Sequence, residues 1–479
     1  MSDARPARRR SAGRARGEPP FLGRRQELAL LEREWRGAAG SFVPIYGRRR
    51  VGKSELILRF IEGRTAIYHV GKVAPAELQV REFLSEAARA LDEPLLARLG
   101  ASDWRAALEA VLGAWKGKGK LVLAFDEFQW SAGASPELPS LLQELWDRRW
   151  RRGGVMLIVC GSVIGFMERE VLGPKSPLFG RRTAQIQLGP FGLREAAEFH
   201  PRWSRTDQAR VRFVVGGVAS YLRAFDPARS FEQNLADHLL SEFSPLFREP
   251  EFLLREELRE VSSYQAVLGA IAAGHTSIRA IAAAAGLPER GLTYYLDQLE
   301  ALGYVARRYP LTGRERPNPR HTRFVLEDPL LRFWFRFVFP NQSAVVRLGP
   351  TRALEEIVKP ELDAYFGGCF ERLCREALAG LYVEEGVSDF TIGEYWDKDV
   401  QIDVVGVRGD GWTDVGECKW GPVASVPALS EELERKVRAY PNPRAATIGR
   451  RLFVHRAPAA AARARGVVWH TLEDLYGPR

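Results

Sequence analysis

An eight-residue stretch in which two glycines enclose a basic run constrains this chain more than any other feature. Residues 47–54 are Gly-Arg-Arg-Arg-Val-Gly-Lys-Ser and match the phosphate-binding pattern G-x-x-x-x-G-K-[ST] at every fixed position. The apolar run at 42–46 predicts a strand before it, and 55–61 has the apolar spacing of a helix after it. Because the pattern requires this strand–loop–helix context, the sequence predicts a P-loop within an α/β fold.

The residue types of the loop suit a bound nucleoside triphosphate. Gly47 and Gly52 let the backbone wrap closely around phosphates, and the loop amides and the helix N-terminus face the anion. Lys53 is expected to reach the β- and γ-phosphates, and the Ser54 hydroxyl to hold Mg²⁺. We therefore expect ATP and Mg²⁺ as cofactors. The candidate nucleotide-binding residues of the loop are Gly47, Arg48, Arg49, Arg50, Val51, Gly52, Lys53 and Ser54.

A second apolar run, at 121–125, ends in two acids, Asp126 and Glu127. Five apolar residues without alternation are typical of a strand buried on both faces of a parallel sheet. Its carboxyl end is where α/β sheets bind ligands. Downstream of a P-loop this is a Walker B pattern. It predicts Asp126 in the Mg²⁺ shell and Glu127 as the residue that orients or deprotonates the attacking water.

Three polar residues follow the next predicted strand, at 155–161. Ser162 is a candidate sensor of the γ-phosphate, with a plain strand-end turn as the alternative. Arg181 and Arg182 are candidates for an arginine finger acting in cis or in trans. Solvated surface arginines are the alternative for this pair.

Length and charge set wider limits. Single cores rarely grow far beyond about 250 residues, so 479 residues predict about two to four domains. Residues 1–17 hold six Arg and one Asp, which is half of the net charge of +10, and predict a disordered basic tail. Contact with nucleic acid and a solvated tail both remain open for it. No apolar run approaches the roughly 18 residues of a membrane span, and the cysteine spacing fits reduced thiols, so we expect a cytoplasmic protein.

The segment 255–327 predicts a winged helix-turn-helix: three helices, then two strands around a Gly/Pro loop at 313–319. The third helix presents Arg290, Thr293 and Tyr294 near its start, where recognition helices meet bases. Six arginines follow, at Arg307, Arg308, Arg314, Arg316, Arg320 and Arg323. They suit a wing that contacts phosphates, and DNA is the expected partner. A lid that packs against protein is the alternative.

The C-terminal part, 345–479, holds a second set of chemically suggestive residues. Strands are predicted around Asp403 and around Glu417 and Lys419. Residues i and i+2 of a strand share a face, so Glu417 and Lys419 project together, and Asp403 on the neighbouring strand can meet them. Two acids and a lysine on one face suit a metal-dependent phosphodiesterase, in which Mg²⁺ or Mn²⁺ activates water.

Several segments resemble one known family. FLGRRQEL, YGRRRVGKSEL, LAFDEFQW, CGS, FGRRT and GGVASYL occur in order over residues 21–240. They are similar to the archaeal-type ATPases of the STAND-like branch of AAA+-related P-loop NTPases. The resemblance implies a helical lid at 189–254. One departure is that Val218-Ala219 stands where the family usually has Ile-Pro.

The acids of the C-terminal part also carry a resemblance. The spacing Asp-x13-Glu-x-Lys, with Glu371 on an upstream helix, is similar to the PD-(D/E)XK nuclease superfamily and to the domain that commonly follows this ATPase. It implies a restriction-endonuclease-like fold with Glu371, Asp403 and Glu417 at a metal and Lys419 beside them. The chain departs from the pattern at Ile402, where the superfamily has proline.

Together these features predict an α/β ATPase with appended domains. The expected parts are a tail at 1–20, the P-loop core at 21–188, the lid at 189–254, the winged helix at 255–327, an aromatic linker helix at 328–344 and the nuclease-like domain at 345–479. The predicted function is ATP hydrolysis coupled to action on DNA. Two alternatives stay open: a DNA-binding regulator with an inert nuclease fold, and a signalling ATPase whose C-terminal domains bind protein. Self-association is a further expectation.

Overall fold

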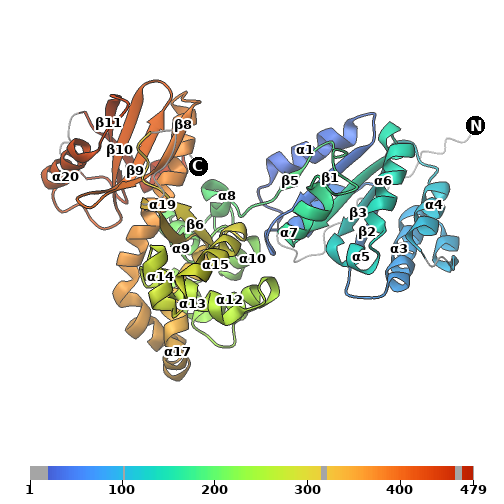
Figure 1. Cartoon of the computed structure of the whole chain (residues 1–479), viewed down its shortest axis with the longest axis horizontal. Coiled ribbons are helices and arrows are strands. Elements are labelled where there is room, and N and C mark those ends of the chain that lie inside the picture. The colour runs from blue at the N-terminus through green and yellow to red at the C-terminus, as the bar shows by residue number, and fades with distance from the viewer. Residues whose placement is uncertain (1–19, 101–102, 314–320, 459–465, 478–479) are drawn as a thin grey trace, which may run out of the picture. The chain divides into compact units, whose positions relative to one another are not determined.

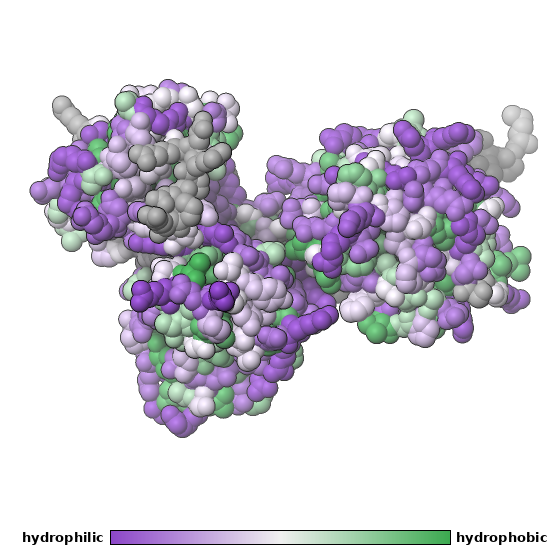
Figure 2. Space-filling view, in the orientation of Figure 1, coloured by the Kyte–Doolittle hydropathy of each residue, from purple (hydrophilic) through white to green (hydrophobic). Residues whose placement is uncertain are grey.

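The chain forms two compact units, residues 1–189 and 190–479, each of which has its own core (Figure 1). The computed structural model describes residues 20–100, 103–313, 321–458 and 466–477. None of the helices in these ranges combines the length and the apolar character needed to cross a membrane. The face drawn in Figure 2 is mostly hydrophilic, and its apolar residues are scattered.

A five-stranded sheet in which all pairs are parallel organises the first unit, as the sequence predicts. The strand order is β2-β3-β4-β1-β5. The strands are β1 (Ser41–Tyr46), β2 (Ala66–Val70), β3 (Leu121–Asp126), β4 (Val155–Gly161) and β5 (Ile186–Gln187). Every residue of β1, β3 and β4 is buried, as expected of central strands covered on both faces.

Two hydrophobic cores lie on opposite faces of this sheet because successive side chains of a strand alternate in direction. In β3, Leu121, Leu123 and Phe125 enter one core, while Val122 and Ala124 enter the other. The first core is closed by α3 (Ala76–Leu91), α4 (Trp104–Ala114), α5 (Phe128–Ala134) and α6 (Leu138–Arg148). The second is closed by α1 (Arg25–Arg36) and α2 (Lys53–Ile61). The short α7 (Ile164–Phe166) follows β4.

The second unit begins as a helical layer. Most of its buried apolar side chains, from Phe191 to Tyr476, form one hydrophobic cluster, and a second cluster includes Ile402, Val405 and Leu433. Its first helices are α8 (Leu193–Ala197), α9 (Arg205–Val215), α10 (Ala219–Ala224), α11 (Phe231–Leu239) and α12 (Pro245–Glu257). They occupy the segment for which the resemblance implies a lid. Next come α13 (Val261–Ala272), α14 (Ile278–Ala285), α15 (Glu289–Ala301) and the antiparallel pair β6 (Val305–Arg308) and β7 (Arg323–Leu326).

The aromatic segment is buried in this unit. It forms α16 (Pro329–Phe333) and a π-helical turn, Trp334–Val338. The Trp334 indole donates a hydrogen bond of 2.8 Å to the Phe247 carbonyl, which satisfies its one polar atom within the core. The segment then continues through α17 (Gln342–Leu348) and α18 (Pro350–Ala353) into the 26-residue α19 (Lys359–Glu384).

A mixed sheet of order β12-β11-β10-β9-β8 completes the second unit. Its strands are β8 (Phe390–Trp396), β9 (Gln401–Arg408), β10 (Trp412–Lys419), β11 (Thr447–Val454) and β12 (Val468–Thr471). β8, β9 and β10 pair antiparallel, whereas β10, β11 and β12 pair parallel. The parallel connection from β10 to β11 runs through α20 (Val426–Ala439), and α21 (Leu472–Tyr476) ends the described chain.

The hairpin β6–β7 is held against this mixed sheet. The Leu311 amide donates to the Glu394 carbonyl at 2.8 Å, and the Tyr440 hydroxyl donates to the Leu311 carbonyl at 3.3 Å. The Arg323 guanidinium lies 4.5 Å from the ring centre of Trp396. The loop end of the hairpin, at Leu311 and Arg323, is therefore part of the packing of the second unit.

One buried histidine makes the stability of the first unit depend on pH. His69, on β2, is 2% exposed and is surrounded by the rings of Phe83, Trp104 and Phe125. Its Nε2 lies 3.3 Å from the hydroxyl of Ser131. Burial lowers the pKa of His69 to about 4, from an ordinary value of 6.5.

We expect the free energy of unfolding to fall as pH drops from 6.5 toward 4. In that window the unfolded chain takes up a proton that folded His69 excludes, so the loss reaches at most about 1.4 kcal/mol per pH unit. His69→Gln keeps a donor near Ser131 but cannot titrate, so its melting temperature should fall less between pH 7.5 and 5. His275→Gln, at an exposed position, is the matched control. Equal slopes for His69→Gln and the parent would contradict the assignment.

Candidate nucleotide site and acid cluster

The P-loop joins β1 to α2 through backbone conformations that favour glycine. Gly47 and Gly52 have φ values of 150° and 95°, and Arg50 has a φ of 65°. A Cβ on Gly47 would lie 2.1 Å from the Leu188 carbonyl oxygen, so only glycine fits there. α2 begins at Lys53, and no side chain of the described residues caps it. The first amides of α2 therefore face the loop and suit a phosphate.

Lys53 lies inside its own loop. It is 5% exposed, and its ammonium donates to the carbonyls of Gly47 at 2.9 Å and Arg48 at 2.8 Å. Burial lowers its pKa, while the nearby acids, Glu127 among them, act in the opposite direction. The charge of Lys53 is thus held at the loop, where phosphate oxygens can replace the two carbonyls.

A residue that the sequence analysis missed fixes the back of the loop. Arg24 is 4% exposed, and its guanidinium donates to the carbonyls of Val51 at 3.0 Å and Gly189 at 2.6 Å. Val51 itself is fully buried in the core on that face of the sheet. Arg24 precedes a helix in an ordinary-looking basic stretch, so only the fold reveals this role.

The acids of β3 lie beside the loop because β4 is the single strand between β3 and β1. The Tyr68 hydroxyl, from β2, donates to Asp126 at 2.6 Å and also forms a hydrogen bond with Ser54. Burial raises the pKa of Tyr68, so the phenol stays a neutral donor. Tyr68 therefore connects the two residues predicted to hold Mg²⁺.

Glu127 has a strained backbone and a restrained carboxylate. Its φ is 48°, a left-handed value that costs a non-glycine residue energy and recurs at functional sites. The Ser162 hydroxyl donates to its carboxylate at 2.7 Å, and the Gln129 amide donates to the same oxygen. Ser162 is 3% exposed. The structure thus brings Ser162 against Glu127, which a plain strand-end turn would not require.

The residues present fit Mg²⁺-ATP. Ser54 and Asp126 supply the hard oxygen ligands that Mg²⁺ prefers, and the loop amides with Lys53 supply donors for phosphates. The Arg48 and Arg49 side chains are half-buried, and that of Arg50 is exposed. All the candidate residues from β1, β3, β4 and the P-loop gather at the carboxyl edge of one parallel sheet.

The two candidate finger arginines differ in their surroundings: Arg181 pairs away from the P-loop, whereas Arg182 lies within electrostatic reach of Tyr46, the residue before Gly47. Arg181 pairs with Asp147 of α6 at 2.8 Å. Shortly after it, the Thr183 amide donates to the carbonyl of Phe42, near the amino-terminal end of β1 and away from the P-loop. The charge of Arg182 reaches Tyr46, where it opposes the larger effect of burial, which raises the pKa of the tyrosine. The Arg181 side chain thus contacts α6 and not the P-loop of the same chain.

The acids of the C-terminal sheet do come together, on β9 and β10. Asp403 and Glu417 are 7% and 2% exposed. Asp403 accepts a hydrogen bond of 3.0 Å from the Cys418 amide, and Lys419 pairs with Glu417 at 2.9 Å. Glu371, on α19, lies within electrostatic reach of Glu417, and burial raises its pKa.

A second lysine, which the sequence analysis missed, lies between these acids. Lys436 of α20 is 6% exposed, its ammonium contacts Glu417, and it lies 3.8 Å from Asp403. Burial, with repulsion from Glu417, raises the pKa of Asp403 to about 8. Among the residues that the structure describes, no group of three or more His, Cys, Asp or Glu is arranged to hold a metal. Here an ammonium group faces both acids, where the sequence analysis places a metal.

A sequence signal for Lys436 exists. The buried face of α20 follows helical spacing through Val426, Leu429 and Leu433, and the next position in that series is Lys436. A lysine in an apolar stripe requires a buried acid nearby, and two acids were available on the preceding strands.

Comparison with known proteins agrees with the geometry of the first unit. Residues 21–222 match the model of a family described as an ATPase domain predominantly from Archaea. Residues 334–433 match a second family, described as archaeal and bacterial proteins of unknown function. Residues 21–222 are thus similar to this ATPase domain, and residues 334–433 are similar to the second family.

Individual relatives cover different shares of the chain. An uncharacterized protein of Methanocaldococcus jannaschii is 28% identical over 403 residues, which are 84% of this chain and 87% of that protein. An uncharacterized ATP-binding protein of the same organism is 46% identical over 44 residues, which are 9% of this chain and 75% of that protein. The structure of a Walker-type ATPase of Pyrococcus abyssi covers 66% of this chain and 96% of its own length, with 20% identity and a TM-score of 0.50. This last likeness shows the fold.

Lys436→Met should convert the acid cluster into one that binds a divalent cation. Without the ammonium, Asp403 and Glu417 repel each other, and breaking a buried pair in this way costs about 3–5 kcal/mol. We expect a lower melting temperature that Mn²⁺ restores, and calorimetric Mn²⁺ binding that Asp403→Asn abolishes. Lys398→Met, whose side chain is 89% exposed, is the control. If the Lys436→Met protein is destabilised but neither binds Mn²⁺ nor regains its melting temperature with Mn²⁺, the acids form only a structural ion cluster.

Proposed function

We propose that the chain hydrolyses ATP at the P-loop and uses the nucleotide state to control a C-terminal part that acts on DNA. The observation that carries the first half is the meeting of Lys53 and Ser54 with Asp126 and Glu127 at one edge of the parallel sheet. This arrangement provides within one site a hydrogen-bond donor to phosphate, two metal ligands and a carboxylate that can activate the attacking water.

The side chains of the site have distinct roles in this proposal. When bound with Mg²⁺, ATP supplies the γ-phosphoryl group that water removes. Lys53 exchanges its contacts to Gly47 and Arg48 for phosphate oxygens. The Tyr68 hydroxyl forms hydrogen bonds with both Ser54 and Asp126, so the two metal ligands are positioned before the metal binds.

Glu127 is the proposed catalytic base, and it is restrained before reaction. Its carboxylate accepts hydrogen bonds from both Ser162 and Gln129, and these two contacts restrain its position. Release of Ser162 toward the γ-phosphate would free the carboxylate. This exchange makes hydrolysis depend on a correctly seated triphosphate.

Two substitutions test this assignment. Lys53→Ala should weaken ATP binding about tenfold to a hundredfold, the equivalent of one or more hydrogen bonds to a charged group. Glu127→Gln should bind ATP normally and lower turnover by about 10²–10⁴, the usual contribution of a general base. Lys118→Ala, at an exposed position, is the control for lost charge. Fluorescent-nucleotide titration and phosphate release measure both quantities. Undiminished ATP affinity in Lys53→Ala would refute the site.

The proposed DNA contact rests mainly on α15. Arg290, Thr293 and Tyr294 are exposed on this helix, with Tyr294 at 62%. The arginines of the strands are engaged within the unit: Arg307 with Asp297 at 2.8 Å, and Arg308 with Glu327 at 2.6 Å. The remaining candidates, Arg314, Arg316 and Arg320, lie outside the described residues. The proposed wing contact therefore rests on these three arginines, because Leu311 and Arg323 on either side of them pack against β8.

Triple substitution of Arg314, Arg316 and Arg320 by Ala should weaken DNA binding for every sequence. Each lost phosphate contact should reduce the slope of log affinity against log salt by about 0.9. Tyr294→Ala should weaken binding without changing that slope, since it removes no charge. Arg347→Ala, exposed on α17, is the control. Fluorescence anisotropy at several salt concentrations gives the slope. An unchanged slope in the triple variant would mean that these arginines make no contact with DNA phosphates.

For the C-terminal domain, the buried ammonium of Lys436 favours the alternative of a nuclease fold that is inert in this conformation. The order α19–β8–β9–β10–α20–β11, with both acids on adjacent strands, supports the nuclease-like fold itself. If Arg181 acts as an arginine finger, its pairing with α6 favours action on the nucleotide site of a second copy of the chain. This would require self-association.

A further inference from the structure

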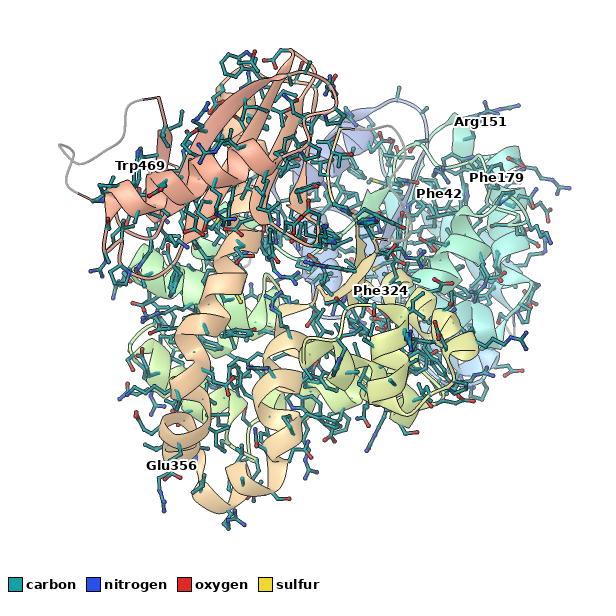
Figure 3. All side chains as sticks on the ribbon, turned by 60° about the vertical axis from the view of Figure 1, so that its left-hand side comes forward. Phe42, Arg151, Phe179, Phe324, Glu356 and Trp469 are labelled. Carbon is teal, nitrogen blue, oxygen red and sulfur yellow. The ribbon has the colours of Figure 1, made fainter. Side chains whose placement is uncertain are left out.

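A cavity of about 390 Å³ lies within the second unit, apart from the P-loop. It is bounded by the end of α13, by β7, by the turn after α16, by α19 and by Glu394 of β8. Phe324 of β7, labelled in Figure 3, is part of its apolar wall, together with Ala364 and Gly368. Its volume is within the range of about 300–1,000 Å³ that small-molecule sites occupy.

Four arginines line this cavity, and three of them form ion pairs. Arg336 pairs with Glu361, Arg372 with Glu327 at 3.1 Å, and Arg375 with Glu394 at 3.7 Å. Arg332 reaches the Leu326 carbonyl at 3.5 Å and the Cys369 sulfur at 3.6 Å, and it forms a hydrogen bond with the Tyr365 side chain. Within the described residues no carboxylate comes within 4 Å of its guanidinium, and its buried Nε lacks an acceptor.

Burial opposes the charge of Arg332, but Cys369, Tyr365 and Glu327 outweigh it and raise its pKa, so the guanidinium stays charged. Glu327 also acts on Arg308 and Arg372, so one carboxylate is shared by three arginines. Burial, followed by repulsion from Arg332, lowers the pKa of Arg372 to about 10. The third lining acid, Glu371, is weakened as a counter-charge because burial raises its pKa. Burying a guanidinium without a carboxylate is costly unless a ligand supplies the missing acceptors.

The geometry points to a binding site for a phosphoryl group, held by the guanidinium groups of Arg332 and Arg372. Arginine presents paired donors that match the oxygens of a phosphate, and a dianion neutralises both residues at once. The apolar wall accommodates the organic part of a phosphate monoester. Two sources share this chemistry: the terminal phosphate of a nucleic-acid strand and a small phosphorylated molecule.

The cavity adjoins the acid cluster of the C-terminal sheet. Arg375 lines the cavity and also donates to the main-chain carbonyl of Asp403. Glu371 lines it and acts electrostatically on Asp403. A phosphoryl group bound here is therefore sensed by the residues that position the two acids. This inference does not depend on ATP hydrolysis in the first unit.

The test uses the full chain with Lys53→Ala, which weakens phosphate binding at the P-loop. Calorimetric titration with inorganic phosphate should give a saturable isotherm. Adding Arg332→Gln should weaken it by about tenfold or more, the equivalent of a charge-assisted hydrogen bond. Arg347→Gln, exposed on α17, should leave it unchanged. No saturable binding, or equal binding by Arg332→Gln, would overturn the proposal.

A second variant separates binding from folding. Gly368→Leu fills the cavity without removing a charge, and a Cβ at this position meets no atom within 4 Å. It should abolish phosphate binding with little change in melting temperature, whereas retained binding would overturn the proposal even if Arg332→Gln fails to fold. Oligonucleotides with a 5′-phosphate or a 5′-hydroxyl distinguish the sources. Preference for the phosphorylated strand assigns a nucleic-acid end, and equal affinity assigns a small phosphorylated molecule.

Discussion

The parallel hydrogen bonding of β4 between β1 and β3 is the interaction on which the candidate nucleotide site depends. It places the ends of three buried strands at one edge, so that the P-loop, the acids of β3 and Ser162 meet although the sequence separates them widely. The strands can pair in this way because alternate side chains fill two separate cores. Substitutions that disturb either core therefore act on the chemistry as well as on stability.

Most of the buried charged side chains of the second unit form ion pairs with other residues of the same unit. Arg308 and Arg372 share Glu327, and Arg451 of β11 reaches both Glu385 and Asp414 in the interior of the sheet domain. Buried arrangements of this kind are sensitive to the loss of any one member, because the others are then left unpaired. Arg332 departs from this pattern, which is why the cavity beside it suggests a ligand.

Local sequence was sufficient to predict those features that depend on the spacing of residues within one continuous segment. The P-loop, the buried strand before Asp126, and the shared face of Glu417 and Lys419 all follow from spacing along one segment. The residues that were missed act across the fold: Arg24 supports the loop from another element, and Tyr68 reaches Asp126 from the neighbouring strand. Lys436 shows the same limit, since its partners lie on strands that only the tertiary structure brings beneath α20.

One guanidinium connects the nucleotide loop to the place where the chain leaves the first unit. Arg24 holds the carbonyl of Val51 in the P-loop and that of Gly189, the last residue before the second unit begins. Any displacement of the loop that lengthens one contact alters the restraint on the other. A single side chain thus joins the main chain of the P-loop to the main chain at Gly189.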